Sequence, residues 1–126
     1  MRAVDTNIVV RLITHDDPKH LAAARAFIAP GAWVSHVVLT EVAWVLEAVY
    51  DRSAAQIAAT IEILLHHEHL TLQDAETISA ALDQFRQHPT VGFSDCLILE
   101  ITRKSGNLPL GTFDRPLAKL DAVERL

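Results

Sequence analysis

The sequence predicts an α/β fold with a central, mostly parallel sheet. Short apolar segments alternate along the chain with segments that begin with helix-capping residues. Strands that are separated by helices form parallel sheets with right-handed crossovers. A chain of 126 residues is long enough for one domain with a sizeable core, so we expect a single domain over residues 1–126.

The composition excludes several classes of protein. Half of the residues are hydrophobic and there are only 4 Gly and 5 Pro, which argues against disorder. No apolar run approaches the ~18 residues of a membrane span, and Asp5 interrupts the first apolar segment, so no secretory signal is expected. The single cysteine excludes an internal disulfide and fits a reducing, cytoplasmic location. The net charge of −5 argues against nonspecific coating of nucleic acid but allows a local basic patch.

The first expected strand is the short apolar segment at residues 3–4. We expect it to be buried, to stop at Asp5 and to lead into a helix, because Asp, Thr and Asn favour caps and turns. A second helix is expected over residues 16–28, with an Asp cap and Pro in its first turn, and Pro30-Gly31 ends it.

The middle of the chain repeats this order. A strand is expected at residues 32–35, followed by a helix over residues 37–50. Ser53 and Gln56 have the spacing of a capping box, which predicts a further helix toward His66.

The last part of the chain contains two expected helices and three expected strands. Asp74 is expected to cap a helix that ends near residue 88. Ser94 is expected to cap the next helix, which ends at Gly106 in a left-handed conformation. The strands are expected at residues 70–72, 108–113 and 122–126, with a turn at residues 114–116.

Four acidic residues are expected to converge on one edge of the sheet. In a βαβ unit the strand ends and the helix starts lie on the same edge, which is where open α/β sheets bind ligands. Asp5 and Asp114 end strands, and Asp95 is in the first turn of its helix. Glu41 is in the second turn of its helix, only ~6 Å of rise from the start.

Each of these acids also has an ordinary structural explanation. Asp5 can cap a helix, Asp95 is favoured at a helix N-terminus, and Asp114 lies in a turn sequence. Glu41 can lie at the edge of the core, although a helical wheel places it in an apolar sector, where a carboxylate is costly without a cation or strong donors. Clustered acids repel one another, and a hard divalent cation, Mg²⁺ or Mn²⁺, removes that conflict.

Four motifs, in this order, resemble the PIN-domain family, and within it the VapC-type toxins of type II toxin–antitoxin pairs. They are Val4-Asp5-Thr6-Asn7, Thr40-Glu41-Val42, Ser94-Asp95-Cys96-Leu97-Ile98 and Gly111-Thr112-Phe113-Asp114. The resemblance covers the whole chain. It implies a three-layer α/β/α sandwich with a central, mostly parallel sheet. It also implies a metal-dependent ribonuclease with an RNA substrate, a small antitoxin partner and a homodimer.

The resemblance also assigns roles to individual residues. Asp5, Glu41, Asp95 and Asp114 match the acidic quartet, and the supporting polar residues match Asn7 and Thr112. Asp5, Asp95 and Asp114 are expected to bind the metal directly, while Glu41 binds a second metal or orients the attacking water. Many relatives carry another acidic residue shortly after the last motif, where this chain has Pro116-Leu117, so one or two metals both stay open.

Basic residues and a groove complete the expected interactions. Arg115 and Arg11 are the candidates for contacts with RNA phosphates, and Arg103 and Lys104 are equally well explained as solvated surface charge. The apolar stripes of the helices at residues 17–28 and 53–65 could border a groove for the antitoxin, if these helices lie side by side.

Other functions are also compatible with the sequence. A PIN-like RNA-binding or scaffold domain without nuclease activity is one alternative, and a housekeeping RNA-processing nuclease is another. A haloacid-dehalogenase-like phosphatase needs a second Asp where this chain has Asn7, which argues against that class.

We expect Cys96 to be a buried filler rather than a reactive thiol, and His66 to His69 to belong to a helix end rather than a metal site.

Overall fold

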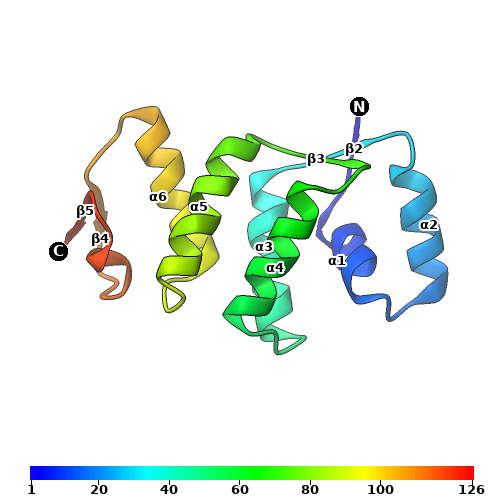
Figure 1. The fold of residues 1–126 in the computed structure, drawn as a ribbon, viewed down its shortest axis with the longest axis horizontal. Coiled ribbons are helices and arrows are strands. Elements are labelled where there is room, and N and C mark those ends of the chain that lie inside the picture. Colours follow the sequence, from blue (N-terminus) through cyan, green and yellow to red (C-terminus); the bar gives the residue numbers. More distant parts are fainter. The chain divides into compact units, whose positions relative to one another are not determined.

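Six α-helices, one short 3-10 helix and five short strands follow one another along the chain (Figure 1). The computed structural model describes residues 1–126, which form two compact units, Met1–Ala75 and Glu76–Leu126. All strand pairs are parallel. The predicted α/β class with parallel strands is therefore confirmed, with one three-stranded and one two-stranded sheet.

The first unit contains a three-stranded sheet in the order β1-β2-β3. Its strands are β1 (Arg2–Ala3), β2 (Ala32–Val34) and β3 (Leu70–Leu72). β2 and β3 each bury their first and last residues and expose the middle one, as expected for a pleated strand. The prediction of a buried first strand is confirmed only for Val4, whose N–H donates to the carbonyl of Trp33, because β1 itself has only two residues, lies at the edge of this sheet and is exposed. Burial begins at Val4, the residue after it.

Four helices complete the first unit: α1 (Thr6–Thr14), α2 (Pro18–Ile28), α3 (His36–Ala48) and α4 (Ala54–Leu65). Each begins after a residue whose side chain accepts a backbone N–H bond, which satisfies one of the free donors at a helix start. The expected Asp17 cap with Pro18 and the Ser53–Gln56 capping box are both confirmed. α1 packs against α2 and α3, and α4 packs against β3 and α3 (Figure 1).

The second unit contains α5 (Ala75–Gln87, whose first residue belongs to the first unit), α6 (Phe93–Ser105), β4 (Leu110–Thr112), a 3-10 helix (Leu117–Lys119) and β5 (Val123–Arg125). The rings of Phe85 and Phe93 meet edge to face, with their centroids 5.9 Å apart, between α5 and the start of α6. β4 pairs with β5 from Leu110 opposite Val123 onward.

The start of α6 differs from the prediction. Ser94 does not cap the helix, because the N-cap position is Gly92 and no side chain bonds to the first turn. The helix therefore starts two residues earlier than a Ser94 cap would place it, and its first residue, Phe93, is buried at 3% exposure against Phe85. The helix end agrees with the prediction: Gly106 has φ +78°, and the N–H of Asn107 donates to the carbonyl of Thr102. None of the helices has the length and hydropathy needed to cross a membrane.

Candidate functional site

The four predicted acids are divided equally between the two units. Asp5 and Glu41 belong to Met1–Ala75, and Asp95 and Asp114 belong to Glu76–Leu126. Neither unit by itself contains three His, Cys, Asp or Glu side chains arranged as a metal-binding group. Two of the acids are therefore described in each unit, and the convergence of all four on one site stays a prediction.

Asp5 is held at the start of α1. It follows Val4 in an extended conformation, and its Oδ1 accepts a hydrogen bond from the N–H of Ile8 at 3.2 Å. The side chain is exposed, as is that of Asn7. A carboxylate has about four lone-pair sites on two oxygens, so the cap leaves Oδ2 able to accept a further ligand. Asp5 is thus both a helix cap and a pre-oriented carboxylate.

Glu41 is exposed in the second turn of α3, so the prediction that it lies in a buried apolar sector is wrong. Its apolar neighbours one turn away are exposed as well: Val37 is 72% exposed and Trp44 is 65% exposed. The helix buries a different stripe, formed by Leu39, Val42, Ala43 and Leu46. α3 is apolar over a wider arc than it buries, so the desolvation argument for a cation at Glu41 fails.

Asp95 lies in the electrostatic field of Asp114. Burial, and then the negative charge of Asp114, raises the pKa of Asp95, which is half-buried in the first turn of α6. This observation agrees with the expectation that clustered acids repel. A divalent cation between two such carboxylates would relieve the repulsion, and oxygen donors are those that Mg²⁺ and Mn²⁺ prefer. The donor chemistry of this pair therefore fits a hard cation.

Local hydrogen bonds fix Asp114 after the end of β4. The N–H of Asp114 donates to Thr112 Oγ1 at 3.0 Å, and Asp114 Oδ2 accepts from the N–H of Leu117 at 2.9 Å. Thr112 thereby holds the backbone of Asp114, while the turn into the 3-10 helix holds its carboxylate. The neighbouring Arg115 is exposed.

Arg11 is engaged in a different network. Its Nη1 lies 2.6 Å from Asp16 Oδ1 and 3.5 Å from the Tyr50 hydroxyl, which itself donates to Asp16 Oδ2 at 2.8 Å. The network ties the last turn of α1 to the turn before α2 and to Tyr50, two residues after the end of α3. A phosphate would have to displace Asp16 from Arg11, which makes Arg115 the better placed of the two predicted RNA contacts.

An open hollow beside Asp5 was not predicted from the sequence. It has a volume of about 560 Å³ and is lined by Ala3, Val4, Asp5, Asn7, Ile8, Ala23 and Phe27. The guanidinium of Arg2 lies over the ring of Phe27, 4.1 Å from its centroid, and donates to the Phe27 carbonyl at 3.1 Å. Ala23 and Phe27 are one helical turn apart in α2, a spacing visible in the sequence, but only the packing of α2 on α1 brings this face next to Asp5.

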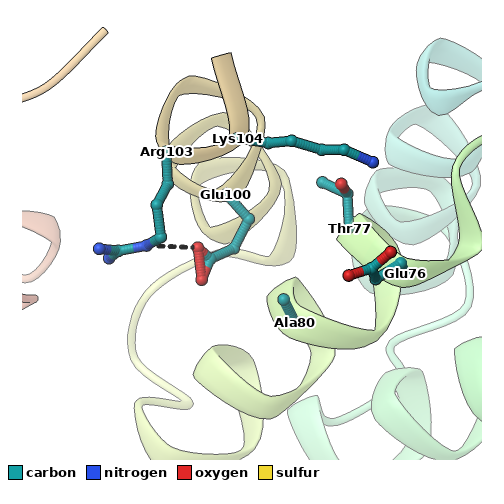
Figure 2. Close-up of a pocket in the computed structure, with 6 residues that line it drawn as sticks. All are labelled: Glu76, Thr77, Ala80, Glu100, Arg103 and Lys104. Atoms are coloured by element: carbon teal, nitrogen blue, oxygen red, sulfur yellow. Dashed lines mark hydrogen bonds and ion pairs between the residues drawn. The ribbon is translucent and has the colours of Figure 1, made fainter. Parts of the chain in front are cut away.

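A smaller pocket of about 180 Å³ lies between α5 and α6 in the second unit. Figure 2 shows the residues that line it, with Arg103 bonded to the buried Glu100. The two atoms, Arg103 Nε and Glu100 Oε2, are 3.0 Å apart. Arg103 therefore neutralises a buried carboxylate, which explains it better than either free surface charge or a phosphate contact.

Two further residue types behave as the sequence suggested. Cys96 is fully buried, and burial raises the pKa of its thiol to about 12, which confirms that it is an inert filler. In the turn after α4, His67 Nδ1 accepts a hydrogen bond from the N–H of His69 at 3.0 Å, and His66 caps the helix end. These histidines thus have a structural place at the end of a helix.

The chain matches the model of a known protein family. The model of the PIN domain family matches residues 2–123, which include all four predicted acids. A search of curated protein sequences gave no match.

Proposed function

Because this chain belongs to the PIN domain family, whose members are generally nucleases, we propose that it is a metal-dependent endoribonuclease that hydrolyses RNA phosphodiester bonds. The observation that carries the proposal is that one family match spans Asp5, Glu41, Asp95 and Asp114. The effect of the Asp114 charge on the pKa of Asp95 supports it, since a cation would offset that charge.

In this proposal the four acids act together. Asp5, Asp95 and Asp114 would hold Mg²⁺ or Mn²⁺, and Glu41 would hold a second cation or orient the attacking water. A cation bound there would polarise a phosphoryl oxygen and lower the pKa of its bound water. The backbone bonds to Asp5 and Asp114 keep both carboxylates in fixed orientations before the cation arrives, which reduces the entropy lost on binding.

The polar and basic neighbours have separate roles. Thr112 holds the backbone of Asp114, and Asn7 offers an amide next to Asp5 for the cation's ligands or the substrate. Arg115, exposed beside Asp114, contacts a phosphate of the RNA. Charge-assisted contacts of this kind position the strand without reading its sequence.

A ribonuclease assay with and without Mg²⁺ tests the catalytic part. We expect cleavage of single-stranded RNA that requires Mg²⁺ and that Asp95→Asn reduces by at least about 100-fold. Ser94→Ala changes the exposed neighbouring residue in the same turn and serves as the control. Cleavage that persists in Asp95→Asn, or in the presence of EDTA, would refute the proposal. RNA binding without cleavage by the wild type would favour an RNA-binding module instead.

The finer part of the proposal is that the enzyme is the toxin of a toxin–antitoxin pair in the cytoplasm, a homodimer that a small antitoxin inhibits. The order and content of the four motifs, which resemble VapC-type toxins, support it. The predicted groove for the antitoxin involves α2 and α4. In the structure α2 packs mainly against α1, whereas α4 packs mainly against β3 and α3. Phe27 of α2 and Ile63 of α4 are apolar residues that these helices leave exposed.

Expression in a bacterial host separates the toxin from a housekeeping nuclease. We expect expression of the wild type to arrest growth, Asp95→Asn to abolish the arrest, and co-expression of a small protein encoded next to this gene to restore growth. Normal growth of cells that contain active, uninhibited enzyme would refute the toxin role, while the nuclease activity would still stand.

A further inference from the structure

The hollow beside Asp5 has the chemistry of a binding site for one nucleotide. Its walls are mainly apolar, from Ala3, Val4, Ile8, Ala23 and Phe27, and its polar groups are confined to Asp5 and Asn7. Ligand sites of about 300–1,000 Å³ that combine apolar walls with a few placed polar groups are typical for small organic ligands. The hollow, at about 560 Å³, lies within this range.

Phe27 is the distinctive residue of this hollow. It is 36% exposed, although α2 buries Ala24 and Ile28 on either side of it in sequence, so its ring is not needed to complete the core. The Arg2 guanidinium lies over this ring and forms a cation–π pair with it. Proteins bind single-stranded RNA with such elements, by stacking bases on aromatic rings or on guanidinium planes.

We propose that this hollow is a nucleobase subsite for single-stranded RNA, in which a base lies against Phe27 and Arg2 contacts an adjoining phosphate. This inference rests on the proposed ribonuclease function and names a second contact of the same substrate. Asp5 belongs to the hollow and to the proposed catalytic site, because it lines the hollow and is a member of the predicted acidic quartet. A nucleotide next to the scissile phosphate would therefore have its base within reach of the hollow.

Charge favours RNA over an apolar peptide as the occupant. Arg2 does not line the hollow, but its guanidinium lies over the ring of Phe27 and the residue is exposed. An apolar peptide would offer this cation no counter-charge. A nucleotide brings its own phosphate to Arg2, and its base has both an apolar face for Phe27 and polar edges for Asn7. The hollow and the neighbouring Arg2 together therefore match a base and its phosphate.

The test combines a protein variant with an altered RNA. Binding of a short single-stranded RNA is measured by fluorescence anisotropy in the Asp95→Asn background, where the oligonucleotide stays intact. We expect Phe27→Ala to weaken binding roughly 5- to 100-fold, the range for loss of one stacked base. Phe27→Tyr should retain binding, and Val49→Ala, which removes an exposed apolar side chain after α3 and outside the hollow, should leave it unchanged.

An abasic scan distinguishes a subsite from a structural role of Phe27. Removing the base at one position of the RNA should weaken binding to the parent protein, and Phe27→Ala should then have no further effect on that oligonucleotide. Arg2→Gln should lower the slope of log K against log salt by about one, as expected for the loss of one phosphate contact. A Phe27→Ala effect that is equal for all oligonucleotides, or no effect at all, would overturn the subsite.

The cleavage assay keeps the two proposals separate. If the wild type cleaves RNA with Mg²⁺ but the abasic scan finds no coupled position, the subsite is wrong and the nuclease stands. If Phe27 and one base are coupled but no cleavage occurs, the subsite stands as part of an RNA-binding module. An apolar partner segment in the hollow would show itself by RNA binding that does not depend on Phe27, which again overturns the subsite.

Discussion

Asp95 and Asp114 share an electrostatic environment in the second unit, although 18 residues separate them in the sequence. Burial raises the pKa of Asp95, and the charge of Asp114 raises it further. Asp95 is placed by the first turn of α6, while Asp114 is held after β4 by Thr112 and the N–H of Leu117. The charge of Asp114 therefore disfavours the ionised form of Asp95, and a bound cation or the removal of one charge would relieve this effect.

The first prediction concerns the stability of this pair. Asp114→Asn should stabilise the metal-free protein by a few tenths to about 1 kcal/mol, because it removes the repulsion and keeps an oxygen for the N–H of Leu117. Thermal unfolding in EDTA measures the effect. The wild type should gain stability when Mg²⁺ is added, by about 2.7 kcal/mol at 100 times Kd, and the variant should gain less. A wild-type melting temperature that does not respond to Mg²⁺ would count against the site.

The second prediction separates the two roles of Asp5. Asn is as good a helix cap as Asp, so Asp5→Asn should keep the bond from Ile8 and change stability by less than about 0.5 kcal/mol. It should nevertheless abolish Mg²⁺-dependent cleavage of RNA, because it removes a charged ligand. Asp17→Asn makes the same change at the cap of α2 and is the matched control, with cleavage retained. Wild-type cleavage by Asp5→Asn would show that its carboxylate serves only as a cap.

The third prediction concerns the Asp16 network and acid unfolding. Hydrogen bonds from Tyr50 and Arg11 lower the pKa of Asp16 to about 2 from its ordinary value of 3.8. Since the folded-state pKa is the lower one, the network stabilises the fold fully above pH 3.8, and this contribution is lost as the pH falls toward 2. Urea unfolding between pH 2 and 5 should show a weaker pH dependence for Asp16→Asn than for the wild type. Asp83→Asn, an exposed acid on α5, is the control for charge alone, and equal slopes in all three proteins would contradict the prediction.

The fourth prediction concerns Cys96. Because burial is the main cause that raises its pKa to about 12, the native protein should react with a thiol reagent at least about 100-fold more slowly than the protein in 8 M urea. The rate of reaction with Ellman's reagent measures this. Cys96→Ala should leave Mg²⁺-dependent cleavage within about twofold of the wild type, despite the position next to Asp95. Rapid native labelling would mean that the interior around α6 opens readily.

The amino-acid sequence by itself determined the local features of this protein. The starts of α2 and α4 and the end of α6 follow from Asp17-Pro18, from Ser53 with Gln56, and from Gly106, because caps depend on hydrogen bonds within a few residues. The parallel pairing followed from the alternation of strands and helices. The four acids could be named from their motifs, since the positions relative to strand ends and helix starts are also local.

The tertiary structure alone decided which surfaces are buried and which distant groups meet. Glu41 looked buried because α3 is apolar over a broad arc, and only the packing of the helix selected the narrower stripe that leaves this residue in water. The ties of Arg11 to Asp16 and Tyr50, and the hollow between Asp5 and Phe27, also join separate elements. Burial and through-space contact depend on what packs against a residue, and a helical wheel or a motif contains no information about that neighbour.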